Sequence, residues 1–264
     1  MSAVIARPTL SAMILAGGRS RRMGTDKALL TLPSGQPLLT KITQVAQTLT
    51  SDVVVMTPWP ERYEAMLPPA VKLLSERTHQ NGPLGGFVQG WNYIHSDWCL
   101  LLACDLPQLE SQPLGEWWHW LQRQTISEQT ISEQTIAAQM SGDDVSSDEL
   151  NGPGADGAIA SLTYRDRLYP DSPLANSKPW ASKQPIPKKQ SMPGKRWEPL
   201  CGFYHRSCLP SLHRHLDAAL NQDHPRRLSF QSWLEPLNVM AYDALPQSVL
   251  FNCNTAEDWA SLQL

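Results

Sequence analysis

The chain has 264 residues, 41% of them hydrophobic, which is enough to bury one substantial core. Its 22 lysines and arginines against 25 acidic residues give a net charge of −3, so no overall positive field recruits nucleic acid or an anionic membrane. No apolar run approaches the roughly 18–20 residues of a membrane span, and no segment has the features of a secretory signal. We therefore expect a cytoplasmic protein with no nucleic-acid or membrane partner, in which any anion site is local.

The number and spacing of the cysteines indicate whether disulfides or a zinc site are present. They are five in number and contain no C-x-x-C pair, which argues against both a disulfide framework and a zinc site. We therefore expect free thiols at Cys99, Cys104, Cys201, Cys208 and Cys253.

Short apolar runs alternate with amphipathic segments through the first half of the chain. The run "SAMILAGG" predicts a strand that opens into a loop at its glycines. Apolar residues at three- and four-residue steps predict a helix within 38–49. Pro83 suits the start of a second helix, which we expect to continue to Ile94. Further apolar runs predict strands at 52–56, 71–75, 98–104 and 156–160.

The last quarter of the chain is also ordered. Residues 199–207 have the pattern of a strand, and residues 208–222 that of a helix with one apolar face. A final short helix is expected within 255–264. We expect Thr255 to cap this helix, because it stands three positions before Asp258, which is the spacing of a capping box.

Two segments do not fit this alternation. Residues 124–155 begin with the repeat "TISEQTISEQTI" and continue as a polar, acidic stretch, and residues 165–197 are rich in Pro, Lys and Ser. We interpret both as exposed, flexible insertions, with a helical start of the first one as an alternative. The organisation expected is thus a single domain over residues 1–264.

Strand and helix alternation predicts an α/β fold with a mostly parallel sheet covered by helices on both faces, because parallel strands need crossover connections. Ligands of such folds gather outside the carboxyl ends of the strands. Gly17, Gly18 and Asp105 fall at that edge.

The stretch "LAGGRSRRMGTDKALL" combines bare backbone with positive charge. Adjacent glycines lack Cβ atoms, so a base or a phosphate can approach the main chain and accept hydrogen bonds from its N–H groups. The cations of the following loop would neutralise a triphosphate. The alternative is a tight glycine turn with an exposed basic loop, and neither a Walker A loop nor a G-x-G-x-x-G fingerprint is present. The four cations are Arg19, Arg21, Arg22 and Lys27.

The segment "LLLACDLPQL" places Asp105 directly after an apolar strand. A carboxylate at that point is suited to Mg²⁺, which keeps most of its waters and takes one or two protein oxygens plus substrate phosphate. The alternative is that Asp105 only caps a turn.

Five segments together resemble the molybdenum cofactor guanylyltransferase family: "LAGGRSRRMGTDKALL", "NGPLGG", "ACDLP", "EPLCGFYHRSCLPSL" and "NCNTAEDW". The resemblance implies a three-layer Rossmann-like nucleotidyltransferase fold. It also implies transfer of GMP from GTP to molybdenum-molybdopterin, with release of pyrophosphate and with Mg²⁺ as cofactor.

The resemblance assigns nucleotide contacts to several positions. Lys27 matches the family lysine that contacts the nucleotide, and Asp105 matches the magnesium aspartate. Glu76 and Asn81 are both candidates for the residue before the G-P-L segment that lies against the nucleotide. The resemblance also implies that the backbone at Gly82 lies close to the nucleotide. The family's Leu-Ala-Gly-Gly backbone contact corresponds to Leu15, Ala16, Gly17 and Gly18.

Other positions are implied for the second substrate and for catalysis. Asn252 and Asn254 match asparagines near the active site, and Arg226 would meet the molybdopterin phosphate. Capping before the final helix and an exposed helix start are the alternatives for these residues. Lys27, Arg22 and the Mg²⁺ on Asp105 would stabilise the departing pyrophosphate, with no general base.

Three other functions remain open at this stage: a molybdopterin cytidylyltransferase, another small-molecule nucleotidyltransferase, and a non-catalytic adaptor that delivers molybdopterin. Backbone contacts at the glycines say little about the identity of the base. Molybdoenzymes or their chaperones are the protein partners that the resemblance would allow.

Overall fold

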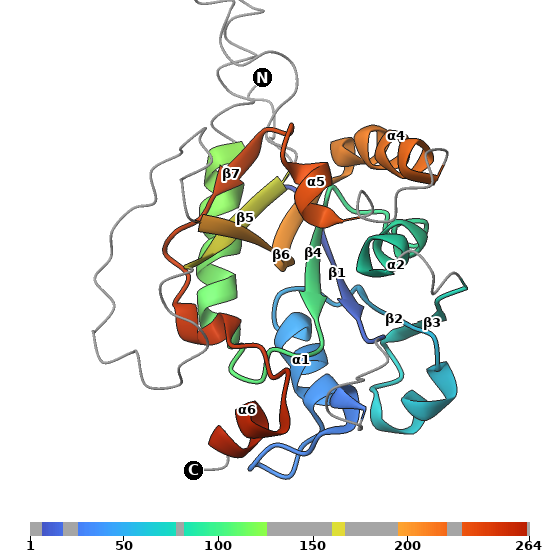
Figure 1. Cartoon of the computed structure of the whole chain (residues 1–264), viewed down its shortest axis with the longest axis vertical. Coiled ribbons are helices and arrows are strands. Elements are labelled where there is room, and N and C mark those ends of the chain that lie inside the picture. Colours follow the sequence, from blue (N-terminus) through green and yellow to red (C-terminus); the bar gives the residue numbers. More distant parts are fainter. Residues whose placement is uncertain are drawn as a thin grey trace, which may run out of the picture.

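The structure is a computed structural model that describes residues 7–17, 26–77, 82–125, 160–166, 195–220 and 229–262. These residues form a seven-stranded sheet in the order β3-β2-β1-β4-β6-β5-β7 (Figure 1). β1 pairs in parallel with β2 and β4, β2 with β3, and β5 with β7. β6 runs antiparallel to β4 and β5. The strands are β1 (Leu10–Leu15), β2 (Val53–Thr57), β3 (Lys72–Ser75), β4 (Trp98–Ala103), β5 (Ala160–Asp166), β6 (Lys195–His205) and β7 (Val239–Ala241).

Helices cover both faces of this sheet (Figure 1). One core cluster joins α1 and a helix at 111–125 to residues such as Ile14, and the other joins α2, α4 and α5 to residues such as Met13. Neighbouring residues of β1 thus face opposite layers, as the two-residue period of a strand requires. The helices are α1 (Leu38–Gln47), α2 (Gly82–Trp91), α4 (Leu209–Leu220), α5 (Phe230–Leu234) and α6 (Ala256–Ser261). Short 3₁₀ turns are η1 (Lys27–Leu29), η2 (Pro60–Arg62), η3 (Glu64–Met66), η5 (Arg206–Cys208) and η7 (Gln247–Leu250).

The mostly parallel, three-layer arrangement confirms the predicted fold class. The strongest sequence signals correspond to the most deeply buried elements: every residue of β2 and every residue of β4 is buried. Strands covered on both faces are expected to be continuous apolar runs, and these two are.

Some boundaries were predicted wrongly. Only Ala160 of the expected strand at 156–160 lies in β5, and residues 156–159 lie outside the described residues. The segment 165–197, expected to be an exposed loop, has both ends in strands: Arg165 pairs with Arg196, and Asp166 with Lys195. Backbone pairing between β5 and β6 holds these polar ends, which carry no apolar alternation. Residues 167–194 lie outside the described part.

The helix at 111–125 was not predicted as a whole. It includes the first two residues of the insertion at 124–155, in line with the alternative of a helical start; residues 126–155 are not described. α2 ends at Trp91, although Ile94 is buried as expected. All five cysteines are free, as predicted.

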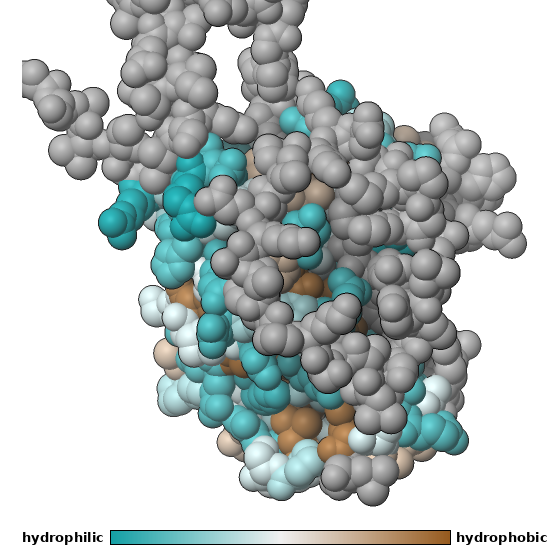
Figure 2. Space-filling view, turned by 90° about the vertical axis from the view of Figure 1, so that its left-hand side faces the viewer, coloured by the Kyte–Doolittle hydropathy of each residue, from teal (hydrophilic) through white to brown (hydrophobic). Residues whose placement is uncertain are grey.

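The described surface is mainly polar. On the face shown in Figure 2, hydrophilic residues predominate among the coloured atoms, and apolar residues appear in small groups. Among the described residues, the exposed large hydrophobic side chains are Leu29 and Tyr93. No helix in the described part of the chain is both long and apolar enough to cross a membrane.

Candidate active site

The carboxyl ends of β1, β2 and β4 are joined by backbone hydrogen bonds. The Ala16 N–H donates to the Met56 carbonyl at 2.9 Å, and the Cys104 N–H donates to the Leu15 carbonyl at 3.3 Å. The segments that follow the three strands therefore start from one edge of the sheet, where a ligand site is expected.

Gly17 stands at this edge with no room for a side chain. A Cβ atom built on it would lie 2.7 Å from Pro58 Cδ and 3.3 Å from Glu76 Oε2. A Cβ on Gly86 of α2 would lie 3.3 Å from the same carboxyl group. The Glu76 carboxylate therefore lies next to glycine backbone of two segments, the one that follows β1 and α2. At the start of α2, Gly82 has a φ of 60°, a conformation that favours glycine.

Lys27 and Asp105, far apart in sequence, meet at this edge. Lys27 Nζ lies 3.2 Å from Asp105 Oδ2 and donates at 2.8 Å to Asn254 Oδ1. The Lys27 and Asp105 side chains are only 17% and 21% exposed. One ammonium group is therefore held between two oxygens, in a setting where water screens charge less than at the surface.

The residues around Asn254 are positioned by Asp105 and by the cap of α6. The Cys253 N–H donates to the Asp105 carbonyl at 3.1 Å. The N–H groups of Asn254 and Thr255 donate to Asp258 Oδ2 at 2.8 and 2.7 Å, and Thr255 caps α6 in the predicted capping box. Since the Thr255 side chain caps α6, the Asn254 side chain is not used for capping and accepts the hydrogen bond from Lys27.

Asp26 fixes the turn that carries Lys27. It caps η1 by accepting from the Ala28 N–H at 3.1 Å, and its Oδ2 accepts from the Tyr63 hydroxyl at 2.7 Å. Arg62 lies 3.6 Å from the same oxygen. Burial and the Asp26 hydrogen bond raise the pKa of Tyr63, so this hydroxyl remains a donor. Sequence analysis missed Tyr63, since no motif marks it.

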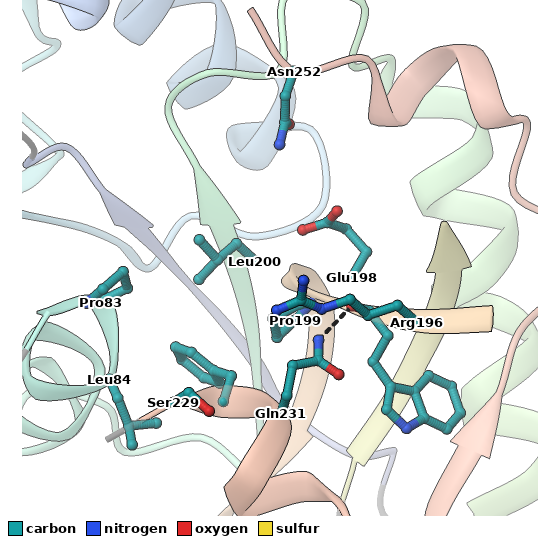
Figure 3. A pocket seen from close by; sticks show the side chains of 11 residues that line it. Pro83, Leu84, Arg196, Glu198, Pro199, Leu200, Ser229, Gln231 and Asn252 are labelled. Atoms are coloured by element: carbon teal, nitrogen blue, oxygen red, sulfur yellow. Dashed lines mark hydrogen bonds between the residues drawn. The ribbon is translucent and has the colours of Figure 1, made fainter. Parts of the chain in front are cut away.

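The other predicted site residues fall into two groups. Asn252 lines a pocket beside the strand edge, together with residues of α2, β6 and α5 (Figure 3). The positions that lie outside the described residues are Gly18, Arg19, Arg21, Arg22, Asn81 and Arg226.

The ligand set at the strand edge is suited to a hard cation. Among the residues that the structure describes, no group of three or more His, Cys, Asp or Glu side chains could hold a metal ion. Asp105 and Asn254 nevertheless present a carboxylate and an amide oxygen to the same cationic group, Lys27 Nζ. Mg²⁺ prefers oxygen ligands and needs only one or two from the protein when phosphate oxygens and waters complete its shell. The residues present therefore fit such an ion.

The neighbouring thiol does not compete for this chemistry. Burial, followed by the negative charges of Asp105 and Asp26, raises the pKa of Cys104, so the group stays a neutral thiol. What the edge offers is one ammonium group, one partly exposed carboxylate and bare backbone. That combination can hold and neutralise a polyphosphate.

Comparison with known proteins identifies the family of the chain. Residues 12–232 match the model of the MobA-like NTP transferase domain. A Nostoc sp. protein named "Probable molybdenum cofactor guanylyltransferase" is 37% identical over 96% of this chain and 90% of its own length. A Synechococcus elongatus protein of the same name is 32% identical over 96% and 98%. The solved molybdopterin-guanine dinucleotide biosynthesis protein A of Archaeoglobus fulgidus shares the fold, with a TM-score of 0.54, 17% identity and 96% coverage of each chain. The chain belongs to the MobA-like NTP transferase family.

Proposed function

We propose that the protein is a molybdenum cofactor guanylyltransferase, which transfers GMP from GTP to molybdenum-molybdopterin and releases pyrophosphate. The names of its relatives support the reaction. The observation that carries the proposal is the position of Lys27, held between Asp105 and Asn254 at the edge of the sheet where β1 also ends, two residues before Gly17. Bare backbone for a nucleotide and charge for its phosphates meet there.

The reaction needs alignment and charge neutralisation rather than a covalent enzyme intermediate. The terminal phosphate of molybdopterin attacks the α-phosphorus of GTP in line, forming a new P–O bond as the bond to the β-phosphate oxygen breaks and pyrophosphate leaves. Lys27 would neutralise the negative charge that develops on the departing phosphates. The attacking phosphate is already an anion, so no side chain has to remove a proton.

Asp105 would hold Mg²⁺ together with phosphate oxygens of GTP. When bound, that ion supplies further neutralisation of the triphosphate. The backbone of Leu15, Ala16 and Gly17 would contact the guanine nucleotide. Glu76 is favoured over Asn81 as the polar residue of this subsite, because its carboxyl lies against both Gly17 and Gly86. Arg22, which lies outside the described residues, would add positive charge.

The free thiols support a reducing compartment, so we place the reaction in the cytoplasm. Delivery of the product to molybdoenzymes or their chaperones remains an expectation.

The experiment is an incubation of the purified protein with molybdenum-molybdopterin and either GTP or CTP, with Mg²⁺ or with EDTA. We expect molybdopterin guanine dinucleotide and pyrophosphate from GTP with Mg²⁺ only. Dinucleotide from CTP alone would reject the base assignment. No product from either nucleotide, with molybdopterin still bound, would favour the delivery adaptor.

A further inference from the structure

A pocket (Figure 3) is lined by Asn252, which stands two residues before Asn254, the partner of Lys27. Its volume is about 410 Å³, which suits a small heterocyclic ligand. Four chain segments build it: the start of α2, the first half of β6, the start of α5, and the segment before α6. The residues that matter for recognition are Pro83, Leu84, Glu198, Leu200, Phe230 and Asn252.

The antiparallel direction of β6 brings this pocket to the catalytic edge. Leu102, near the carboxyl end of β4, pairs with Cys201, so the β6 residues before Cys201 extend past the end of β4 toward Asp105. The opposite wall is fixed by Gln231 of α5, whose Nε2 donates to the Trp197 carbonyl at 2.7 Å. The pocket is therefore held open by the fold itself.

The pocket and the Lys27 site share one short piece of chain. Asn252 lines the pocket, while Asn254 accepts from Lys27. Two residues of extended chain span at most about 7 Å. A ligand whose ring fills the pocket can therefore extend a phosphate group toward Lys27.

Five polar side chains and several apolar ones line the pocket; the polar ones are those of Arg196, Glu198, Ser229, Gln231 and Asn252. The Glu198 carboxylate points from β6 toward Asn252, across a space walled by Leu200 and Pro83 (Figure 3). Asn252 Oδ1 is buried and has no hydrogen-bond partner among the described residues. Such a group is rare in a native fold and calls for an explanation, and a bound ligand is one that suits an amide lining a pocket. An amide that turns about its last side-chain bond can offer a donor or an acceptor to a ligand.

This pattern matches one kind of heterocyclic edge. A 2-amino-4-oxopyrimidine presents two adjacent N–H donors followed by a carbonyl acceptor. A carboxylate can accept both donors at once, and an amide can donate to the carbonyl. Flat rings with this edge also suit the apolar walls formed by Pro83, Leu84 and Phe230.

Both substrates of the proposed reaction contain such an edge, in the pterin of molybdopterin and in the guanine of GTP. The start of α2 separates two carboxylates: Glu76 is against Gly86 and Gly17, whereas Glu198 belongs to the pocket lined by Pro83 and Leu84. We propose that this pocket binds the pterin ring of molybdopterin, with Glu198 reading its 2-amino-4-oxo edge and Asn252 completing the contact. The inference rests on the proposed function for the identity of the second substrate.

The decisive variant is Glu198→Gln, which keeps the shape but turns one acceptor into a donor. We expect the KM for molybdenum-molybdopterin to rise about 10- to 100-fold, as for a lost hydrogen bond to a charged group, and the KM for GTP to stay within about twofold. Asn252→Ala should likewise raise the KM for molybdenum-molybdopterin. Glu235→Gln, an exposed residue just after α5 that does not line the pocket, is the matched control and should change neither constant.

A binding measurement separates this inference from the proposed function. Calorimetric titration with pterin and with lumazine, in which a carbonyl replaces the 2-amino group, needs no turnover. The wild-type protein should bind pterin at least about 10-fold more tightly than lumazine, and Glu198→Gln should lose that preference. Equal affinity of the wild-type protein for the two probes would overturn the inference even if guanylyl transfer is observed. So would a Glu198→Gln variant that raises the KM for GTP instead. A failure to form any dinucleotide would reject the proposed function and leave the probe comparison valid.

Discussion

Replacing Gly17 with alanine should weaken GTP binding, because an added methyl group has no room at the end of β1. It would lie 2.7 Å from Pro58 Cδ and 3.3 Å from Glu76 Oε2. To restore an ordinary contact, the proline ring or the strand end has to move by roughly 0.7 Å. The proline ring is closed onto its own backbone, so the movement is transmitted to main chain.

Overpacking of this kind costs about 1–3 kcal/mol. Part of that cost appears as lower stability, and part as displacement of the backbone at Leu15, Ala16 and Gly17 that would contact the nucleotide. We expect the Kd for GTP to rise about 10-fold, which corresponds to about 1.4 kcal/mol. Isothermal titration calorimetry measures the Kd, and thermal unfolding followed by circular dichroism measures the loss of stability.

Gly115→Ala is the control for this experiment. A Cβ on Gly115 would meet nothing within 4 Å, and the residue lies inside the helix at 111–125. Alanine is favoured over glycine in a helix by about 0.5–1 kcal/mol, so this variant should bind GTP normally and unfold at the same or a higher temperature. A folded Gly17→Ala protein with the wild-type Kd for GTP would refute the role given to this backbone.

Three further predictions concern the surroundings of Lys27. Tyr63→Phe removes the hydroxyl that donates to Asp26, and a hydrogen bond to a charged group is worth about 1.5–3 kcal/mol. Steady-state kinetics should therefore show a kcat about 10-fold lower. An unchanged kcat would show that the turn carrying Lys27 is held without this hydrogen bond. Asp258→Asn weakens the capping box that positions Asn254, so the free energy of unfolding should fall by about 1 kcal/mol and kcat should fall with it. Lower stability with full activity would contradict the positioning role of Asp258. Burial raises the pKa of Cys253 to about 11, so at pH 8 roughly one thiol in a thousand is ionised and iodoacetamide should modify it slowly in the native protein. Mass spectrometry of the alkylated peptide checks this, and rapid modification would show that the thiol is not buried.

The sequence was sufficient to predict the parts of the fold whose stability is local or repeated along the chain. β1, β2 and β4 are apolar runs with clear ends, and the capping box at Thr255 depends on residues only three positions apart. The parallel order of these strands follows from the alternation with helices. It brings Gly17 and Asp105 to one edge without further information, as predicted.

Contacts between distant parts of the chain could not be predicted in this way. Lys27 and Asn254 are 227 positions apart, and the hydrogen bond between them depends on how the last segment docks against Asp105. Tyr63 reaches Asp26 across 37 positions, and no motif marks Tyr63. Such pairs are fixed by tertiary packing, which residue spacing does not encode.

The unpredicted helix at 111–125 has a similar explanation. Its Trp117 ring stacks on Tyr242 with centroids 4.9 Å apart, and its Nε1 donates to Ser161 Oγ at 2.9 Å. Both partners come much later in the sequence. Most of the stability of a helix in a protein comes from packing of this kind rather than from intrinsic propensity.

The most direct test of the account compares Lys27→Met with Lys72→Met in the rate of dinucleotide formation from GTP and molybdenum-molybdopterin. Both variants lose one positive charge, but Lys72 begins β3 and pairs with Asp52 at 2.7 Å, away from the carboxyl ends of the strands. The account predicts a kcat at least about 100-fold lower for Lys27→Met, because a positioned charge is worth several kcal/mol in the transition state, and wild-type turnover for Lys72→Met. Near-normal turnover by a folded Lys27→Met protein would contradict it.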